Sequence, residues 1–368
     1  MVAATGDGVN DAPALKRAHV GVAMGSQNAS DVAREAADII LLDDNFASIV
    51  AAIEEGRTLF ENLRKTIAYT LAHTVPEVVP ALLNLAFGLP LPLNGLIILT
   101  IDLLTEQGPA ISLAFEASEH AVMQRPPRDI ARDRLVKAQT LVYSYLIAGF
   151  TISATCFLAY LLAFTTRGVS ISHLGFSTDD TAFWSPPPRR RNAFDSQLFN
   201  ATRYASGDPA YVAAITPRHQ RLPLSFVAAH NGAAIYPPLW VNSDGSVLDA
   251  RQQWRIFQEA QSAWYITLVM CQFWHIHHCR TRTESIFTRG LLTNMATLYG
   301  CVAEVAIACF VVYLPAFHNP QAFQTSSLKP LLWVPQFAFA VFILAYNELV
   351  KLAVRRRPDS WVARYLHW

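Results

Sequence analysis

Charged residues are scarce in this sequence. Asp, Glu, Lys and Arg make up 15% of its 368 residues, whereas hydrophobic residues make up 52%. Soluble domains carry about 25% charged residues, so this deficit favours a membrane protein. Neither sign of charge prevails, because 29 Lys and Arg residues are balanced by 28 Asp and Glu residues. Without a basic excess there is no electrostatic attraction for nucleic acid, and we expect no nucleic-acid partner.

Cysteine is also sparse. The sequence has 5 cysteines and no CxxC pair, which argues against zinc and dithiol redox sites and favours reduced structural thiols. A signal peptide is not evident, since residues 1–6 lead into a glycine-rich turn rather than a basic segment followed by an apolar stretch. We therefore expect the N-terminus to be cytosolic.

Residues 1–60 read as the C-terminal part of an α/β domain. Predicted strands and helices alternate over residues 1–5, 12–19, 20–24, 29–37 and 38–42. This alternation predicts a parallel sheet, in which ligands bind at the carboxyl ends of the strands. The segment GDGVND, residues 6–11, follows the first predicted strand at such an end.

From Phe46 onward the pattern predicts a long amphipathic helix that becomes apolar near Ile67 and leads into a membrane. Each of the later apolar stretches is close to the length of about 20 residues that a spanning helix needs. They cover about 66–88, 93–115, 140–165, 260–279, 291–315 and 331–350. The sequence therefore predicts a mostly α, multi-pass protein in contact with membrane lipid, with a six-helix transmembrane bundle.

Basic residues mark the predicted cytosolic side of this bundle, following the positive-inside rule. They are Arg125, Arg128, Arg132, Arg134, Lys137, Arg280, Arg282, Arg289, Lys351, Arg355, Arg356 and Arg357. Both termini are thus predicted to be cytosolic. The expected divisions are a stalk with three spans over 61–165, a non-cytosolic loop over 166–259, and three spans with a basic tail over 260–368. The loop is either a folded cap or partly disordered, and it holds a glycosylation sequon at Asn200.

The string TGDGVNDAPAL, residues 5–15, concentrates polar ligand atoms in a turn. Asp7, Asn10 and Asp11 supply two carboxylates and an amide beside glycines that let the backbone bend sharply. Mg²⁺ is usually held by one or two carboxylates together with phosphate oxygens and water. The segment therefore predicts a Mg²⁺ and phosphate site, and the alternative is a surface turn without a ligand.

Four acidic residues fall within the predicted spans: Glu77, Asp102, Glu106 and Glu304. A charge inside a bilayer costs about 2.5–3.5 kcal/mol on insertion scales, so each calls for an explanation. Pro76 deprives the carbonyl of Ala72 of its helical partner beside Glu77, while Asp102 and Glu106 share one helix face. These groups predict a cation site. The alternative is that the acids share protons or hydrogen-bond neighbouring helices without an ion.

Several segments resemble one family, the P-type ATPases, in their sodium/potassium and proton/potassium pump group. They are TGDGVNDAPAL, VGVAMG, EAADIILLDDNFASIVAAIEEGR, NLRKTIAYTL, IDLLTEQGPAISLAFE, RPPRD and VKLAVRRRPDSWV. The resemblance implies a partial phosphorylation domain of the haloacid-dehalogenase-like (HAD-like) type, followed by the family's fifth to tenth membrane helices. It also implies transport of monovalent cations, Mg²⁺ as cofactor, ATP as the energy source of the intact pump, and a plasma-membrane location.

By this resemblance, Asp7 ligates Mg²⁺, while Asn10 and Asp11 organise the phosphate and its attacking water. The residues matching the family's cation site are His73, Thr74, Glu77, Asp102, Glu106 and Gln272, to which Glu304 is added on its intramembrane position alone. The sequence contains neither DKTGT, which holds the phosphorylated aspartate, nor TGES. Since the acyl-phosphate cycle needs that nucleophile, we expect this chain alone not to hydrolyse ATP.

The sequence departs from the sodium/potassium pumps at the cation site. Glu106 stands where those pumps carry Asp, His73 where they carry Ser, and His275 where they carry Asp on the fourth span. Proton/potassium pumps carry a lysine at the position of His73, which leaves proton involvement open. Three histidines near the end of that span, His275, His277 and His278, could form an interfacial polar cluster or ligate a metal.

Pumps of this group dock an accessory β subunit through an SYGQ motif, and residues 166–259 contain no such motif. Three functional hypotheses stay open. The chain is the C-terminal fragment of a cation pump, or a truncated, non-catalytic membrane protein with a regulatory or cation-binding role, or a passive cation pore.

Overall fold

The computed structural model describes residues 2–25, 29–43, 45–119, 122–124, 126, 134–174, 184, 240–241, 247–248, 250–319 and 322–368. The chain divides into two compact units. The first comprises Met1–Glu61 with Ser118–Pro127, and the second comprises Asn62–Ala117 with Arg128–Trp368. The sequon at Asn200 and most of the predicted loop 166–259 lie outside the described residues.

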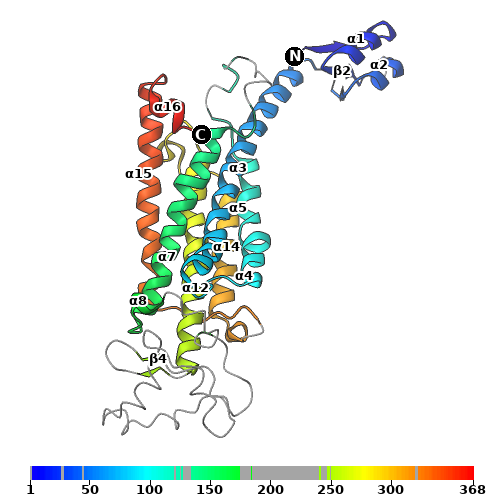
Figure 1. Ribbon diagram of the computed structural model, residues 1–368. Coiled ribbons are helices and arrows are strands. Elements are labelled where there is room, and N and C mark those ends of the chain that lie inside the picture. Colours follow the sequence, from blue (N-terminus) through cyan, green and yellow to red (C-terminus); the bar gives the residue numbers. More distant parts are fainter. Residues whose placement is uncertain are drawn as a thin grey trace, which may run out of the picture. The chain divides into compact units, whose positions relative to one another are not determined.

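The first unit contains the small parallel sheet that the alternating pattern predicts. Its elements are β1 (Ala3–Gly6), the 3₁₀ turn η1 (Val9–Asp11), α1 (Ala12–Arg17), β2 (Val20–Met24), α2 (Asp31–Ala36) and β3 (Ile39–Leu41). The strands are parallel in the order β1-β2-β3, with β2 in the centre (Figure 1). Leu15 of α1, Ala23 of β2 and Ala33 of α2 form the core of the unit. The expected order of strands and helices is confirmed.

The second unit is a bundle of long helices. Its principal elements are α3 (Ala47–Phe87, which begins in the first unit), α4 (Gly95–Thr100), η2 (Ile101–Thr105), α5 (Gln107–Ser112), η3 (Leu113–Phe115), α6 (Ala138–Leu141), η4 (Val142–Gly149), α7 (Phe150–Thr165), α12 (Ala250–Cys279), α14 (Met295–Tyr313) and α15 (Pro335–Arg356). Both η2 and η4 are π-helical turns, whereas η3 is a 3₁₀ turn.

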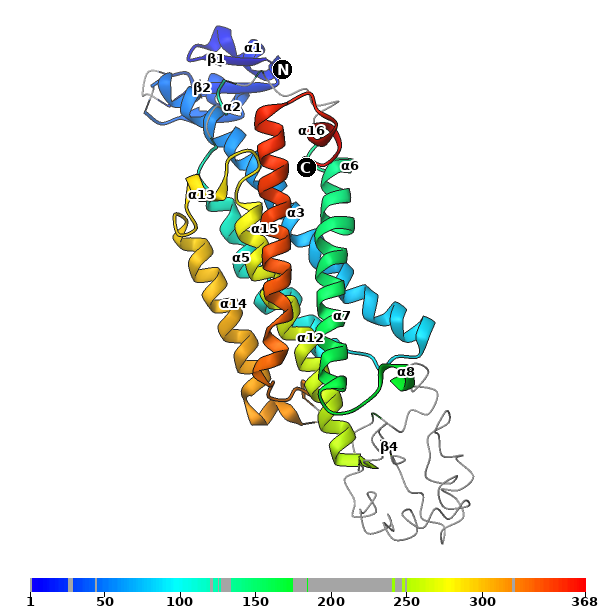
Figure 2. The same cartoon turned by 90° about the vertical axis from the view of Figure 1, so that its left-hand side faces the viewer.

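Short elements lie in the connections between these helices. They are α8 (Ile171–Leu174), β4 (Trp240–Val241), β5 (Val247–Leu248), α13 (Ile286–Arg289), η6 (Pro315–His318) and η7 (Pro330–Trp333), and α16 (Trp361–Tyr365) follows the last long helix. Figures 1 and 2 show α7, α12 and α15 running along one another in both views.

Within the described part of the chain, 4 helical stretches are long and apolar enough to cross a membrane, rather than the six expected. They are Gly95–Phe115, Ala138–Thr165, Met295–Tyr313 and Pro330–Arg356. The other two expected spans are helical, but they fall within α3 and α12, which carry many polar side chains. His73, Thr74 and Glu77 interrupt the apolar run of α3, and Gln272 with three histidines interrupts that of α12.

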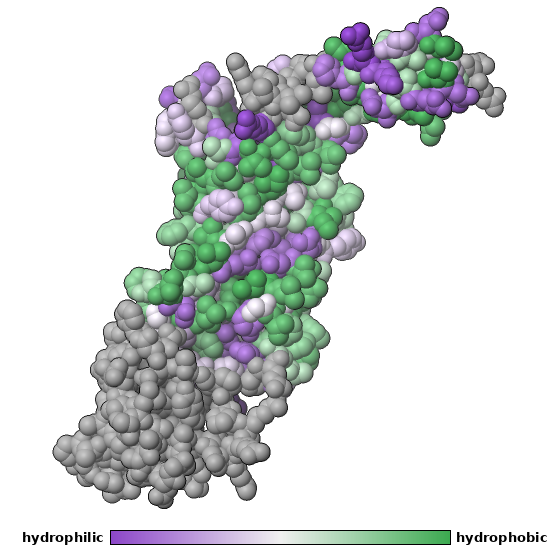
Figure 3. Space-filling view, turned by 45° about the vertical axis from the view of Figure 1, so that its right-hand side comes forward, coloured by the Kyte–Doolittle hydropathy of each residue, from purple (hydrophilic) through white to green (hydrophobic). Residues whose placement is uncertain are grey.

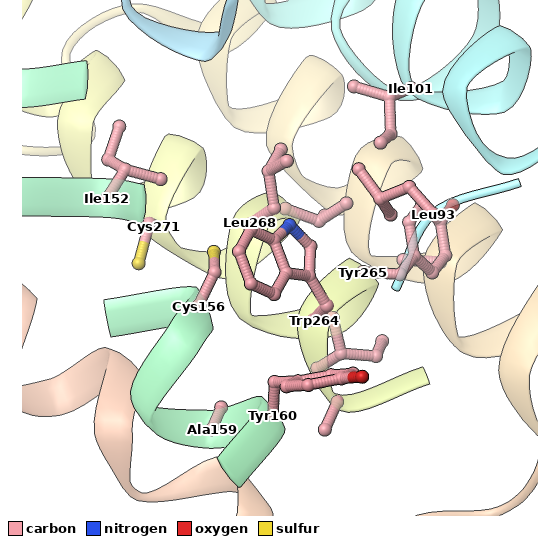
Figure 4. Close-up of a cluster of buried hydrophobic side chains, with 14 of the residues drawn as sticks. Leu93, Ile101, Ile152, Cys156, Ala159, Tyr160, Trp264, Tyr265, Leu268 and Cys271 are labelled. Atoms are coloured by element: carbon pink, nitrogen blue, oxygen red, sulfur yellow. The ribbon is translucent and has the colours of Figure 1, made fainter. Parts of the chain in front are cut away.

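The polar side chains of α12 are accommodated because this helix is buried inside the protein. Its side chains are almost all inaccessible from Trp254 to Cys279. Figure 4 shows Trp264 of α12 among apolar side chains, with Tyr160 and Cys156 of α7 nearby. The rings of Trp264 and Tyr160 meet edge to face at 6.0 Å. Because α12 is surrounded by other helices, it can carry polar side chains and still be buried. The amino-acid composition of α12 alone would therefore suggest a more exposed helix than the structure shows.

All cysteines of the chain are unpaired, as expected for structural thiols. Cys156, Cys271, Cys279 and Cys301 are buried, and Cys309 is half-buried. Cys156 and Cys271 lie in the apolar core drawn in Figure 4.

Candidate functional site

The loop after β1 places the predicted Mg²⁺ residues at the carboxyl end of the first strand. Asp7 and Asn10 are exposed, and Asp11 is half-buried. The carboxylate oxygen Oδ2 of Asp11 accepts hydrogen bonds from the backbone N–H groups of Asp7 at 3.2 Å and Gly8 at 3.0 Å. A Cβ at Gly6 would lie 2.4 Å from Cβ of Asp11, so only glycine fits there. Asp11 thus folds the loop into a tight turn that presents Asp7 and Asn10 outward.

This donor set suits a hard divalent cation. The exposed carboxylate of Asp7 and the side-chain carbonyl of Asn10 are oxygen ligands of the kind that Mg²⁺ prefers. One carboxylate oxygen of Asp11 accepts hydrogen bonds from the loop amides and so holds the conformation of the loop. Its other oxygen is available to bind a metal ion. The residues present therefore fit a Mg²⁺ ion shared with a phosphate group.

A second polar cluster lies between α3 and η2 in the helical unit. Nε2 of His73 lies 3.4 Å from Oδ1 of Asp102 and 4.0 Å from Oε2 of Glu77. On the other edge of the ring, Nδ1 of His73 contacts Oε2 of Glu106. One imidazole thus stands among three carboxylates, and we call these four residues the cage. In Figure 3 hydrophilic residues interrupt the otherwise apolar side surface of the bundle.

A π-helical turn shapes the side of the cage that η2 supplies. The N–H of Glu106 bonds to the carbonyl of Ile101, five residues earlier, at 3.0 Å. Such a turn widens the helix locally, and π turns are frequent at functional sites. Asp102 lies within the turn and Glu106 at its end. The side chain of Asp102 is 43% exposed and that of Glu106 only 4%, so the cage has a buried end and an open end.

The other predicted cation residues lie near the cage or apart from it. Glu304 of α14 is buried, and the described contacts of the cage do not include it. Thr74 is exposed, and the described contacts of the cage do not include it. Gln272 belongs to a different network, since its Oε1 lies 3.2 Å from Nδ1 of His275.

That second network surrounds His275 with neutral groups. Nε2 of His275 lies 3.2 Å from the hydroxyl of Tyr143 and 3.4 Å from Sγ of Cys279. Among the described residues, the only group with metal-ligand spacing is His73, Glu77 and Asp102. The metal alternative for His275, His277 and His278 is therefore not supported.

The prolines of α3 leave carbonyls without helical partners, as predicted, but those carbonyls face the protein. A Cβ at Gly149 of η4 would lie 2.8 Å from the carbonyl oxygen of Ala72, so this oxygen is packed against Gly149. Pro80 cannot donate to the carbonyl of Pro76, and the indole N–H of Trp264 donates to it instead at 3.2 Å. The sequence analysis did not identify Trp264 as this donor. The signal was present, because Pro80 follows Pro76 by four residues and therefore leaves the carbonyl of Pro76 without a helical N–H partner.

Two family models match the chain. The model described as "Cation transporting ATPase, C-terminus" matches residues 90–353, and that of "haloacid dehalogenase-like hydrolase" matches residues 1–53. The chain belongs to the cation-transporting ATPase family. Within that family it is 35% identical over 368 residues to the sodium/potassium-transporting ATPase subunit alpha of Drosophila melanogaster. It is 34% identical over 369 residues to the sodium/potassium-transporting ATPase subunit alpha-3 of Gallus gallus.

The matches cover 100% of this chain, but only 30% of the fly protein and 31% of the chicken protein. The chain thus corresponds to the C-terminal portion of a P-type cation ATPase and spans less than a third of these relatives. The HAD-like part at its N-terminus and its multiple membrane-spanning helices agree with the resemblance drawn from the sequence.

Proposed function

We propose that this chain forms the cation-site helices and the Mg²⁺ loop of a pump that moves monovalent cations, coupled to ATP hydrolysis in the intact protein. The observation that carries the proposal is the cage, because three carboxylates meet around one histidine between two helices of the membrane bundle. Such groups are costly in a membrane unless they bind something or bind one another. The sodium/potassium type is proposed from the two relatives.

The loop after β1 serves the phosphate chemistry in this proposal. Asp7 would hold Mg²⁺, with Asn10 and Asp11 positioning the phosphate and its attacking water. A bound Mg²⁺ ion would neutralise charge on the transferred phosphoryl group. Asp11 keeps the loop closed through its two backbone hydrogen bonds, so that the carboxylate of Asp7 is held at the carboxyl end of β1.

The membrane arrangement proposed for the intact pump has six spans. We include α3 and α12 because the cage lies on α3 and because α12 is buried among the other helices. Both termini are proposed to be cytosolic, in a plasma membrane, from the basic residues in the connections. A β subunit, if it takes part, would need contacts other than the SYGQ motif.

Glu77→Gln tests the cation site. In membranes bearing the full-length gene product, we expect the apparent affinity for ⁸⁶Rb⁺ uptake to fall about 10-fold or more, since an interaction with a charged group contributes about 1.5–3 kcal/mol. Glu55→Gln on the exposed face of the same helix is the control and should leave uptake unchanged. Equal uptake by both variants, together with normal Mg²⁺-dependent phosphorylation from ATP, would rule out Glu77 as a cation ligand.

A further inference from the structure

The two ring nitrogens of His73 have different surroundings. Nδ1 contacts the buried carboxylate of Glu106, whereas Nε2 is directed at Asp102 and Glu77. Carboxylates lie against both ring nitrogens, so the ion-free cage favours the doubly protonated imidazolium. A metal ion at Nε2 would displace the proton there, while Glu106 keeps the proton on Nδ1, and Nε2 then becomes a metal ligand beside two carboxylates.

This arrangement matches the carboxylate–histidine–metal pattern of transition-metal sites. A histidine that ligates a metal almost always directs its second nitrogen to a carboxylate, carbonyl or water, which fixes the orientation of the ring. Here Glu106 occupies that outer position, and its side chain is only 4% exposed. Glu106 therefore holds the ring of His73 in place from the buried side.

The donor atoms on the inner side are close enough to share one ion. One ligand atom each from His73, Glu77 and Asp102 can be chosen so that all lie within 4.8 Å of one another. The ligands of a tetrahedral zinc-sized ion are about 3.4 Å apart at bond lengths of about 2.0–2.2 Å, so the three side chains must draw together by up to about 1.4 Å to bind it. Asp102, with its side chain 43% exposed, leaves the ion a route of entry.

Some polar atoms at the cage have no hydrogen bond to satisfy them. Oε1 of Glu77 and Oε1 of Glu106 are buried without a hydrogen-bond partner among the described residues. Glu106 itself is one of the least accessible acids in the described part of the chain. Buried acceptors of this kind are stabilised by a cation.

We propose that the cage binds a divalent first-row transition-metal ion of the Zn²⁺ class, in competition with the transported monovalent cation. His73, Glu77 and Asp102 are the ligands, and Glu106 is a positioning residue. Imidazole nitrogen suits Zn²⁺, Fe²⁺ and Ni²⁺, whereas Mg²⁺ prefers oxygen. The inference rests on the proposed function, because it assigns a competing ligand to the same site.

Co²⁺ is the probe for this site, because a nitrogen ligand changes its visible absorption spectrum. The full chain is purified in detergent and titrated with Co²⁺, followed by displacement with Zn²⁺. We expect one Co²⁺ per chain, with absorption bands that Zn²⁺ abolishes and that an equal concentration of Mg²⁺ leaves intact. Displacement by Mg²⁺ at equal concentration would show that nitrogen is not a ligand and would overturn the proposal.

Substitutions locate the bound metal. His73→Gln should abolish the Co²⁺ bands, and Glu77→Gln should weaken binding. Glu106→Gln should weaken affinity about 10–100-fold, as expected for an outer partner of a ligating histidine. His318→Gln is the matched control, because Nε2 of His318 lies 2.9 Å from the carbonyl of Val312, away from the cage residues in sequence. Far-UV circular dichroism confirms that each variant is folded. Co²⁺ bands that survive in a folded His73→Gln variant would contradict the assignment.

Flux measurements separate this inference from the proposed function. If both hold, Zn²⁺ should inhibit ⁸⁶Rb⁺ uptake by the full-length product competitively, and more weakly in the His73→Gln variant. Normal cation uptake without Co²⁺ binding would overturn only the metal inference. Co²⁺ binding at His73 without any cation-dependent uptake would instead overturn the proposed transport function.

Discussion

Replacing Glu116 by glutamine should lower the free energy of unfolding of the helical unit by about 3–5 kcal/mol, as expected when one partner of a buried ion pair is removed. Glu116 and Arg280 have side chains only 2% and 1% exposed, and Nε of Arg280 donates to Oε2 of Glu116 at 2.9 Å. Asn294 donates a further bond to Glu116 at 2.9 Å. Without the carboxylate, the guanidinium of Arg280 stays buried with neutral acceptors alone, namely the carbonyls of Gly290 and Leu291 and the hydroxyl of Thr293.

The buried cysteines provide the measurement. Because Cys156, Cys271, Cys279 and Cys301 become accessible only on unfolding, a thiol-reactive fluorophore reports the melting temperature in detergent. Asp359→Asn is the matched control, since Asp359 belongs to the same helical unit and is exposed. Interactions of exposed charges contribute about 0–1 kcal/mol. Equal melting temperatures for Glu116→Gln and Asp359→Asn would show that burial of the Glu116 pair does not matter.

The same pair predicts a pH dependence. Burial by itself raises the pKa of Glu116, but hydrogen bonds from Arg280 and Asn294 outweigh it and hold the pKa below its ordinary value of 4.5. A carboxyl with a lowered pKa stabilises the fold above its unfolded pKa and loses that contribution as pH falls through the folded pKa. The wild-type melting temperature should therefore fall below pH 4.5, and this part of the fall should be absent from Glu116→Gln.

Local sequence patterns predicted the first unit well, because its elements are short and self-contained. Each predicted strand and helix between residues 1 and 42 is present within a few residues, since short apolar strands alternate there with short helices. Ser30 illustrates this, because its hydroxyl accepts the N–H of Val32 and starts α2 where the pattern places it. Such signals lie within a few residues of the element that they specify.

The helical unit was harder to predict, because its polar residues have partners far away in the chain. Arg280 was assigned to the cytosolic end of a span from its charge, yet it is buried against Glu116, 164 residues away. The Ala72 carbonyl, which Pro76 leaves without a helical partner, packs against Gly149, 77 residues further along the chain. In each case the sequence identifies a group that needs a partner, and only the packing of the helices decides which one it finds.

The acidic residues of the cage could be identified from the sequence, but the backbone turn that positions them could not. The intramembrane positions of Glu77, Asp102 and Glu106 indicate a cation site, and in the structure their carboxylates lie around His73. The π turn at η2 was not predicted. Proline in a sequence indicates a helix kink, but no residue type indicates a π turn in the same way. This turn carries Asp102.

Gly300→Ala should destabilise the helical unit by about 1–3 kcal/mol, as expected for overpacking. A Cβ at Gly300 of α14 would lie 2.9 Å from both the carbonyl carbon of Gly108 and the nitrogen of Pro109. These are backbone atoms of α5, so no side chain can rotate away and the two helices must separate. The thiol-accessibility melting assay should show a lower melting temperature.

The other glycines of these helices supply controls with different expected outcomes. A Cβ at Gly108 would lie 3.5 Å from Cα of Gly300, an ordinary van der Waals contact, so Gly108→Ala should be tolerated at that crossing. Gly56 of α3 has nothing within 4 Å, and alanine there should stabilise the helix by up to about 1 kcal/mol. Because Gly108 follows Glu106 by two residues and Gly300 precedes Glu304 by four, separating α5 from α14 should also weaken ⁸⁶Rb⁺ affinity. If Gly300→Ala melts like Gly56→Ala, the close approach of the two backbones is wrong.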